Sequence, residues 1–199
     1  MSEYTEKSAF EKSVSGIKVK TIVLIGLMTA VICVLGPLSV PLPFTPVPIS
    51  LTNLAIYFTV YVVGMKRGTV SYLIYLLIGF IGVPVFSAFT SGPGKLLSAT
   101  GGYLIGFIFL ALICGFFIDK WPQKRYLHCT GMIIGMVVAY LFGTLWLAYQ
   151  AGMSFPAATL AAVIPFIPGD LVKILLAVLA GPQIRKRLNA AGLSYCDDN

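Results

Sequence analysis

Long stretches without a charged residue constrain this chain more than any other feature. Residues 21–65 contain no Asp, Glu, Lys or Arg, and neither do residues 126–169. Residues 68–118 contain a single charge, Lys95. A helix that crosses a bilayer needs about 20 apolar residues, so each stretch is long enough to cross, turn and return. We therefore expect an all-α integral membrane protein built as a bundle of six transmembrane helices.

Composition supports this expectation. Hydrophobic residues make up 58% of the 199-residue chain and charged residues 11%, whereas a soluble domain carries roughly 25% charged residues. Such a chain cannot form an ordinary water-facing surface, which excludes a soluble enzyme, a soluble nucleic-acid binder and a disordered linker. The apolar stretches also lack the alternation of a membrane β-barrel strand.

The six helices are expected between the turn signals of the chain. Their predicted ranges are 17–35, 50–64, 69–82, 101–118, 131–149 and 168–184. We expect residues 17–189 to form a single six-helix membrane domain, flanked by cytoplasmic tails at 1–16 and 190–199.

The distribution of Lys and Arg predicts the orientation of the bundle. Twelve basic residues lie in the two tails, in the turn between the second and third helices, and in the loop between the fourth and fifth. The opposite loops contain Lys95 alone. Because cytoplasmic loops are enriched in Lys and Arg, both termini are expected in the cytoplasm. This bias also explains the net charge of +7 without a nucleic-acid partner.

Two outer connections have unusual compositions. Residues 36–48, here called the proline segment, contain five prolines and no charge. Proline restricts φ and removes a donor, so this segment is stiff, and it is either a lid over the bundle or a rigid connector. The next connection ends in Thr100, Gly101, Gly102 and Tyr103. This motif caps and packs the following helix, or it presents Tyr103 and the glycine backbone to a ligand.

Apart from Lys18 and Lys20 at the start of the first range, Asp170 and Lys173 are the only charged residues within the predicted spans. Their spacing places them on one face of the last helix, and ionisable groups at membrane depth favour a functional site. They form either a self-neutralising structural pair or the floor of a ligand site, with Lys173 meeting a carboxylate and Asp170 accepting N–H donors. Trp146 and Gln150, near the outer end of the fifth helix, are candidates for a stacking wall and an amide contact.

No constellation of residues indicates catalysis or metal binding. No plausible constellation of Ser, Cys or carboxylate residues surrounds His128, and the four cysteines contain no CxxC pair. Lys95 lacks the flanking residues of a phosphate-binding loop. We therefore expect no enzyme, no metal and no cofactor. Two stripes of small residues predict close helix packing, either within the bundle or against a membrane partner: Gly26 and Ala30, and Gly131, Gly135, Ala139 and Gly143.

An ordered set of motifs resembles the BioY family, the biotin-binding subunits of energy-coupling-factor transporters. The matching segments are 43–51, 82–86, 100–107 and 165–173, the last of which contains Pro-Gly-Asp-x-x-Lys. Two departures stand out. Thr52 and Asn53 occupy the stretch where the family usually has Gln, so Asn53 is the expected substitute. Ser98 and Ala99 stand where the family usually has Gly-Pro.

The resemblance implies a bacterial cell-membrane subunit that binds biotin from outside. Its implied partners are a transmembrane coupling protein and two cytoplasmic ATPases, and its surroundings are the lipid bilayer. The implied site lies under the proline segment, with Phe44 and Thr45 as expected contacts in addition to the residues above. Small residues on the first helix of such subunits face the coupling protein, which corresponds here to Gly26 and Ala30.

Three other functions stay open on the residues alone. A secondary carrier would need a coupling ion and preferably inverted repeats, and neither is evident. An intramembrane enzyme would need a catalytic set. A pure assembly subunit would use Asp170 and Lys173 only as a structural pair.

Overall fold

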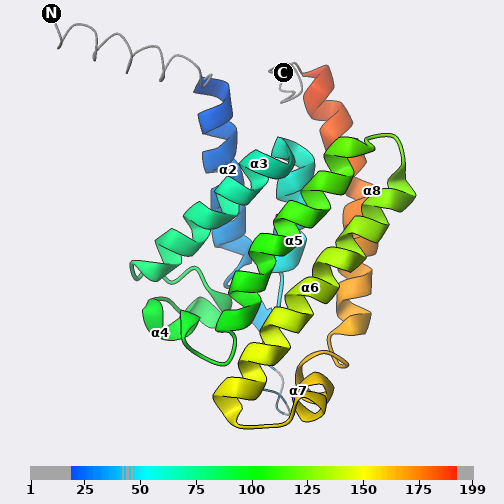
Figure 1. Cartoon of the computed structure of the whole chain (residues 1–199). Coiled ribbons are helices and arrows are strands. Elements are labelled where there is room, and N and C mark those ends of the chain that lie inside the picture. Colours follow the sequence, from blue (N-terminus) through cyan, green and yellow to red (C-terminus); the bar gives the residue numbers. More distant parts are fainter. Residues whose placement is uncertain (1–18, 42, 44, 46, 192–199) are drawn as a thin grey trace, which may run out of the picture.

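The computed structural model describes residues 19–41, 43, 45 and 47–191, and these residues are mostly helical (Figure 1). They form seven α-helices, one 3₁₀ helix and one two-stranded hairpin. In chain order the elements are α2 (Val19–Leu35), β1 (Ser39–Val40), β2 (Ile49–Ser50), α3 (Thr52–Phe80), η1 (Ser87–Phe89), α4 (Pro93–Leu96), α5 (Gly101–Lys120), α6 (Arg125–Ala151), α7 (Phe155–Ala162) and α8 (Ile167–Ala190).

Helix α3 is the hub of the bundle, because α2, α5 and α8 all pack against it. Helix α6 packs against α5 and α8 on the other side. The interior contains several buried aromatic rings, and Tyr75 meets Tyr72 and Phe86 at centroid distances of 5.5 and 5.6 Å. Rings of this size bury a large apolar area and fix the spacing between helices.

The two short helices predicted at 50–64 and 69–82 correspond to the two arms of α3, which meet at a break at Gly64 rather than through a turn at residues 65–68. The chain reverses at Gly64, whose φ of 78° and ψ of −179° are not helical. Only glycine adopts this conformation readily. The backbone N–H of Met65 then donates to Asp119 Oδ2 at 2.8 Å, which supplies an acceptor at the start of the second arm of α3.

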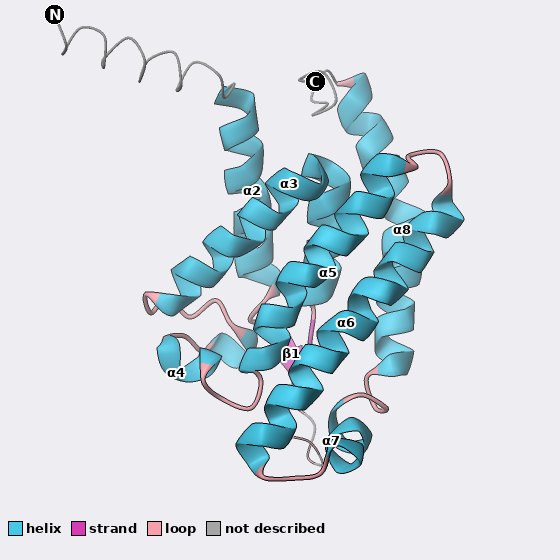
Figure 2. Cartoon of the chain, in the orientation of Figure 1, coloured by secondary structure: helices cyan, strands magenta, loops and turns pink. Residues whose placement is uncertain are grey.

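The remaining helices were predicted with boundary errors of up to six residues. Helix α6 begins at Arg125 rather than at residue 131, and α8 extends to Ala190. The short helices α4 and α7 and the β1–β2 hairpin were not predicted (Figure 2). Strand β1 lies within the proline segment and β2 directly follows it, and the hairpin pairs Ser39 with Ser50.

The small residues on α6 pack against other helices of the bundle. Of the two predicted alternatives, packing within the bundle and docking of a membrane partner, α6 thus uses the first. A Cβ added to Gly131 would lie 2.6 Å from Phe117, and one added to Gly143 would lie 2.3 Å from the Tyr103 ring. Gly26 on α2 differs, because an added Cβ would meet nothing within 4 Å. The outer face of α2 therefore has room for a neighbour.

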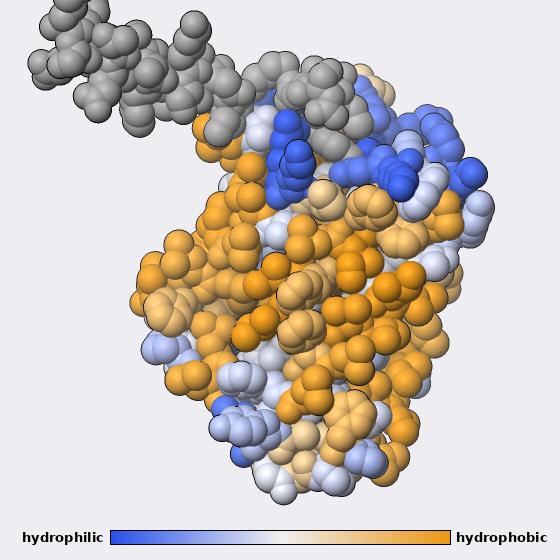
Figure 3. Space-filling view, viewed as in Figure 1, coloured by the Kyte–Doolittle hydropathy of each residue, from blue (hydrophilic) through white to orange (hydrophobic). Residues whose placement is uncertain are grey.

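Three of the described helices are long and apolar enough to cross a membrane: α5, α6 and α8. Helix α2 is also apolar but shorter. An apolar band crosses the middle of the visible surface, and hydrophilic residues gather at the end where α8 terminates (Figure 3). Helix α2 begins and α8 ends at this same end, whereas α7 lies at the opposite one (Figure 1). The six-span count and the cytoplasmic position of the termini stay predictions.

Candidate functional site

A buried ion pair lies near the start of α8. Pro168 occupies the first turn, where its missing N–H costs nothing, and it starts the helix just before Asp170. Asp170 and Lys173 are each 7% exposed, and Lys173 Nζ lies 2.9 Å from Asp170 Oδ1. Lys173 Nζ also donates to the Ser50 carbonyl at 2.6 Å, which connects α8 to the β1–β2 hairpin.

Side chains from two other helices complete the coordination of Asp170. Asn53 Nδ2 on α3 donates to Oδ1 at 2.8 Å, and Tyr140 on α6 donates its hydroxyl to Oδ2 at 2.5 Å. Burying a charge is expensive unless it is paired and hydrogen-bonded, and this carboxylate satisfies both conditions. We call Asn53, Tyr140, Asp170 and Lys173 the polar floor.

The polar floor keeps some hydrogen-bonding capacity. A carboxylate has about four acceptor positions, and Asp170 uses three of them among the described residues. Lys173 uses two of its three N–H bonds in the same part of the chain. The floor can therefore accept one further donor and donate one further N–H to a ligand.

A cavity opens onto the polar floor and leaves about 60 Å³ for the centres of water-sized molecules. Its walls combine apolar and aromatic side chains with a few hydroxyls, the usual composition of a small-molecule site. The lining residues are Val47, Pro48, Ser50, Thr52, Asn53, Ser87, Thr100, Tyr103, Leu104, Phe107, Met136, Tyr140, Ala162, Phe166, Asp170 and Lys173.

The proline segment forms part of the cavity wall. Val47 is buried and packs in one cluster with Tyr103, Leu147 and Phe166, and Pro48 beside it also lines the cavity. The end of this segment thus lies against α5, α6 and the residue that precedes α8.

The predicted site residues divide into two groups. Asp170, Lys173, Tyr103, Asn53 and Thr100 all line the cavity. Tyr103 also donates its hydroxyl to the Ala162 carbonyl at 3.0 Å, which holds α5 against the end of α7.

The members of the second group that the structure describes lie outside the cavity lining. Thr45 accepts a hydrogen bond from the Val47 backbone N–H at 3.2 Å, and Phe44 falls outside the described residues. Gly101 lies against the Leu96 carbonyl, which an added Cβ would contact at 1.7 Å. For these residues a ligand contact stays a prediction.

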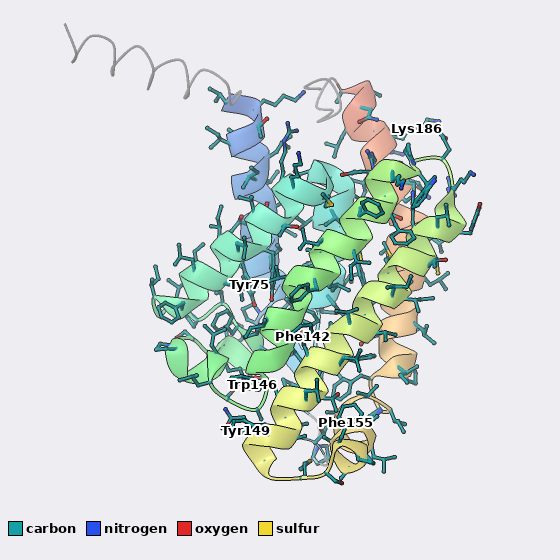
Figure 4. All side chains as sticks on the ribbon, in the orientation of Figure 1. Tyr75, Phe142, Trp146, Tyr149, Phe155 and Lys186 are labelled. Carbon is teal, nitrogen blue, oxygen red and sulfur yellow. The ribbon has the colours of Figure 1, made fainter. Side chains whose placement is uncertain are left out.

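Trp146, labelled on α6 in Figure 4, and Gln150 also lie outside the lining, and both hold the loop that precedes α5. Trp146 Nε1 donates to the Ser98 carbonyl at 2.9 Å, and Gln150 Nε2 donates to the Leu97 carbonyl at 2.6 Å. Both contacts fix the loop that carries Thr100 into the cavity wall. In the same loop, burial lowers the pKa of Lys95 below its usual value.

Sequence reasoning missed Tyr140, although a signal for it exists. Tyr140 follows Ala139 in the small-residue stripe that marks the inward face of α6. Its position next to this face could therefore have indicated a hydroxyl that points into the bundle. The Ser50 carbonyl, Met136, Phe107 and Phe166 carried no such signal, because only the tertiary fold brings them to the cavity.

His128 has structural partners. Its ring is 2% exposed and lies between the Tyr61 hydroxyl, 3.2 Å from Nδ1, and the Trp121 carbonyl, 3.0 Å from Nε2. These contacts connect α6 with α3 and with the end of α5.

Apolar helices around a small polar cavity define a class, the helical membrane proteins that hold a small solute. The comparisons with known proteins narrow this class. The chain belongs to the BioY family, whose family model matches residues 6–190.

Relatives and a solved structure agree with this assignment. The chain is 33% identical over 176 residues to the biotin transporter BioY of Lactococcus lactis, covering 85% of this chain and 93% of the relative. It is 36% identical to the biotin transporter BioY of Rhizobium etli, covering 83% and 92%. These relatives are transporters, which confirms the expectation of a protein other than an enzyme.

The fold matches a crystal structure of the S-component for biotin from an ECF-type ABC transporter. The TM-score is 0.79 at 32% sequence identity, and the match covers 84% of this chain and 92% of that one. The expected family is therefore confirmed by sequence and by fold.

Proposed function

We propose that this chain captures biotin from the outer side of a bacterial cell membrane, as the substrate-binding subunit of an energy-coupling-factor transporter. The observation that carries the proposal is the polar floor, a buried carboxylate and ammonium with unused hydrogen-bonding capacity at the base of a partly aromatic cavity. Biotin offers matching groups: ureido N–H donors beside a carbonyl, an apolar fused ring and a carboxylate tail.

The geometry indicates that Asp170 and Lys173 bind the same end of the ligand. The sequence suggested that Lys173 meets the carboxylate and Asp170 the N–H donors. Lys173 Nζ and Asp170 Oδ1 lie only 2.9 Å apart, however, whereas the two polar ends of biotin are separated by its ring and chain. We therefore assign the ureido group to both residues, its N–H to Asp170 and its carbonyl to Lys173. The carboxylate then meets the hydroxyls of Ser87 and Thr100 in the loop region between α3 and α5.

The membrane arrangement follows from the fold. We propose six crossings, made by α2, the two arms of α3, α5, α6 and α8, with both termini in the cytoplasm. The partners are the transmembrane coupling protein and two ATPases. Gly26 and Ala30 remain the proposed docking positions, supported by the open space beside Gly26 and the exposure of Ala30.

Equilibrium binding of labelled biotin to the purified, detergent-solubilised chain tests the proposal. Lys173→Met and Asp170→Asn should each weaken binding by about 30-fold or more, because removing one member of a buried hydrogen-bonded pair costs about 2–5 kcal/mol. Lys95→Met is the matched control, since Lys95 lies outside the cavity lining. Absence of binding by the unaltered chain would overturn the biotin assignment. Binding that survives both changes in folded protein would reduce the pair to a structural role.

A further inference from the structure

A second and larger cavity lies on the outside of the bundle, between α6, α7 and α8. It leaves about 420 Å³ for the centres of water-sized molecules, compared with about 60 Å³ in the polar cavity. We call it the lateral groove. Its lining residues are Ile133, Met136, Val137, Tyr140, Leu141, Thr144, Phe155, Thr159, Val163, Ile167, Asp170, Leu171 and Ile174.

The lateral groove faces the apolar surface of the bundle. Val137 and Leu141 on one wall are 50% and 47% exposed, and Leu171 on the other wall is 51% exposed. Both walls belong to helices that are long and apolar enough to cross a membrane. Aliphatic walls offer water few hydrogen bonds, so hydrocarbon fits this space better than water.

The length and position of the groove match one leaflet of a bilayer. From Ile133 to Thr144 the α6 wall runs about 16 Å at the usual helical rise, close to half of the roughly 30 Å hydrocarbon core. Helix α7 closes one end of the groove with Phe155, which lies at the end of the bundle opposite Lys186 (Figure 4).

We infer that the lateral groove binds one acyl chain of a bilayer phospholipid from the leaflet on the α7 side. The chain lies between α6 and α8 with its head group beside α7 and its methyl end near Ile133 and Ile174. Because the exposed residues on both walls of the groove are apolar, the groove opens directly onto the lipid of the bilayer. Bound hydrocarbon replaces the dispersion contacts that an unfilled groove of this size lacks.

The bound chain also contacts the polar floor from outside. Met136, Tyr140 and Asp170 line both cavities, so the Tyr140 side chain forms part of the wall between them. An acyl chain against this ring restrains Tyr140 while its hydroxyl donates to Asp170. This consequence rests on the proposed function: lipid in the groove strengthens biotin binding in the cavity.

Native mass spectrometry of the detergent-solubilised full chain, with palmitoyl-oleoyl phosphatidylglycerol or phosphatidylcholine added, tests the site. The unaltered chain should retain one phospholipid of either kind, because the groove recognises the acyl chain. Val137→Trp and Leu171→Trp fill the groove from opposite walls and should abolish retention. Leu145→Trp and Val172→Trp are matched controls, exposed on the same helices but outside the lining, and should retain the lipid.

Gel filtration and thermal unfolding check that each of the four variants is folded. Because each wall of the groove has its own filling variant, the test still works if one of them misfolds. Equal retention by filling and control variants would overturn the proposal, as would retention of phosphatidylglycerol alone, which indicates head-group binding. A dimer that only the filling variants disrupt would assign the groove to a second copy and also overturn it.

Labelled-biotin binding with and without added phosphatidylcholine tests the coupling separately. Lipid should tighten binding by about fivefold or more, the lower range of ordinary coupling between sites, in the unaltered chain and the controls but not in the filling variants. Lipid retention without any biotin binding would refute the proposed function and leave the lipid site standing. Equal biotin affinity with and without lipid would refute the coupling.

Discussion

At the scale of single residues, one carboxylate joins three helices. Asp170 on α8 receives hydrogen bonds from Asn53 on α3 and Tyr140 on α6, in addition to the Lys173 ammonium. Such a buried pair is weak evidence for stability, because desolvation offsets much of the attraction. It has a clearer role in geometry, since three satisfied donors fix the direction in which the remaining acceptor position points.

Tyr140→Phe tests this positioning role. The change removes one hydrogen bond to a charged group and keeps the ring, so it should weaken biotin binding by about 10- to 150-fold, corresponding to about 1.5–3 kcal/mol. Tyr149→Phe is the matched control, because Tyr149 lies on the same helix and is 83% exposed. Titration with labelled biotin provides the measurement, and equal affinities for the two variants would contradict the role.

Charge in an uncharged background made part of this site predictable. Asp170 and Lys173 stand out because the long stretches around them lack Asp, Glu, Lys and Arg, and Asn53 followed from the family motif. Trp146 and Gln150 were singled out by the same reasoning, yet their side chains bind loop carbonyls. Helical spacing places a residue at a height along the bundle, but the neighbour it meets depends on packing that a single sequence does not specify.

At the scale of elements, the break at Gly64 decides how α3 is built. The first arm carries Thr52 and Asn53 toward the cavity, and the second arm returns along α2. Gly115 on α5 lies so close to the break that an added Cβ would approach Met65 Cα to 2.5 Å. The break is thus fixed by a backbone conformation and by a close contact.

Gly64→Ala should therefore destabilise the protein. Its φ of 78° with ψ near 180° is almost restricted to glycine, and the strain amounts to about 1–3 kcal/mol. Gly26→Ala is the control, because Gly26 is helical with open space around it, and alanine there should be neutral or stabilising by up to about 1 kcal/mol. Thermal unfolding in detergent compares the two, and equal melting temperatures would argue against strain at residue 64.

Hydrophobic stretches predicted the long helices well and the short elements poorly. Helices α5 and α8 begin within one residue of their predicted starts, because Thr100 and Pro168 mark those starts in the sequence. Helix α7 was missed since eight residues are too few to cross a bilayer, and its apolar composition resembles that of the neighbouring spans. The reversal expected between the second and third helices occurs at Gly64, the last residue of the predicted range 50–64, and residues 65–68 already belong to the second arm.

At the scale of the whole molecule, an apolar band separates two different ends (Figure 3). One end carries exposed basic residues such as Lys186, and the other carries α7 and the loops around the cavity. The outer face of α2 adds a further distinction, since Gly26 and Ala30 form a smooth strip without an internal neighbour at Gly26. This asymmetry suits a subunit that binds a solute near one end and a membrane partner along one side.

Gly26→Leu tests the docking assignment. The added side chain enters open space, so folding and biotin binding by the isolated chain should be unchanged, whereas close approach of a partner helix should be blocked. Co-purification with the coexpressed coupling protein and ATPases should fall by about tenfold, comparable to an overpacking cost of about 1–3 kcal/mol. Gly94→Leu, which also enters open space but lies in α4, is the control. Undiminished assembly of Gly26→Leu would move the docking surface elsewhere.

Helix α8 connects the cavity to a distant ionic contact. Lys173 lies in the cavity, and Arg185, about 18 Å further along the helix, lies 3.6 Å from Asp119, the residue that accepts the Met65 N–H at the reversal of α3. A pivot of α8 by about 10° at its cavity end would move Arg185 by about 3 Å over that rise, nearly the Arg185–Asp119 separation. Under such a pivot, a small adjustment around a bound solute would change an ionic contact at the other end of the helix.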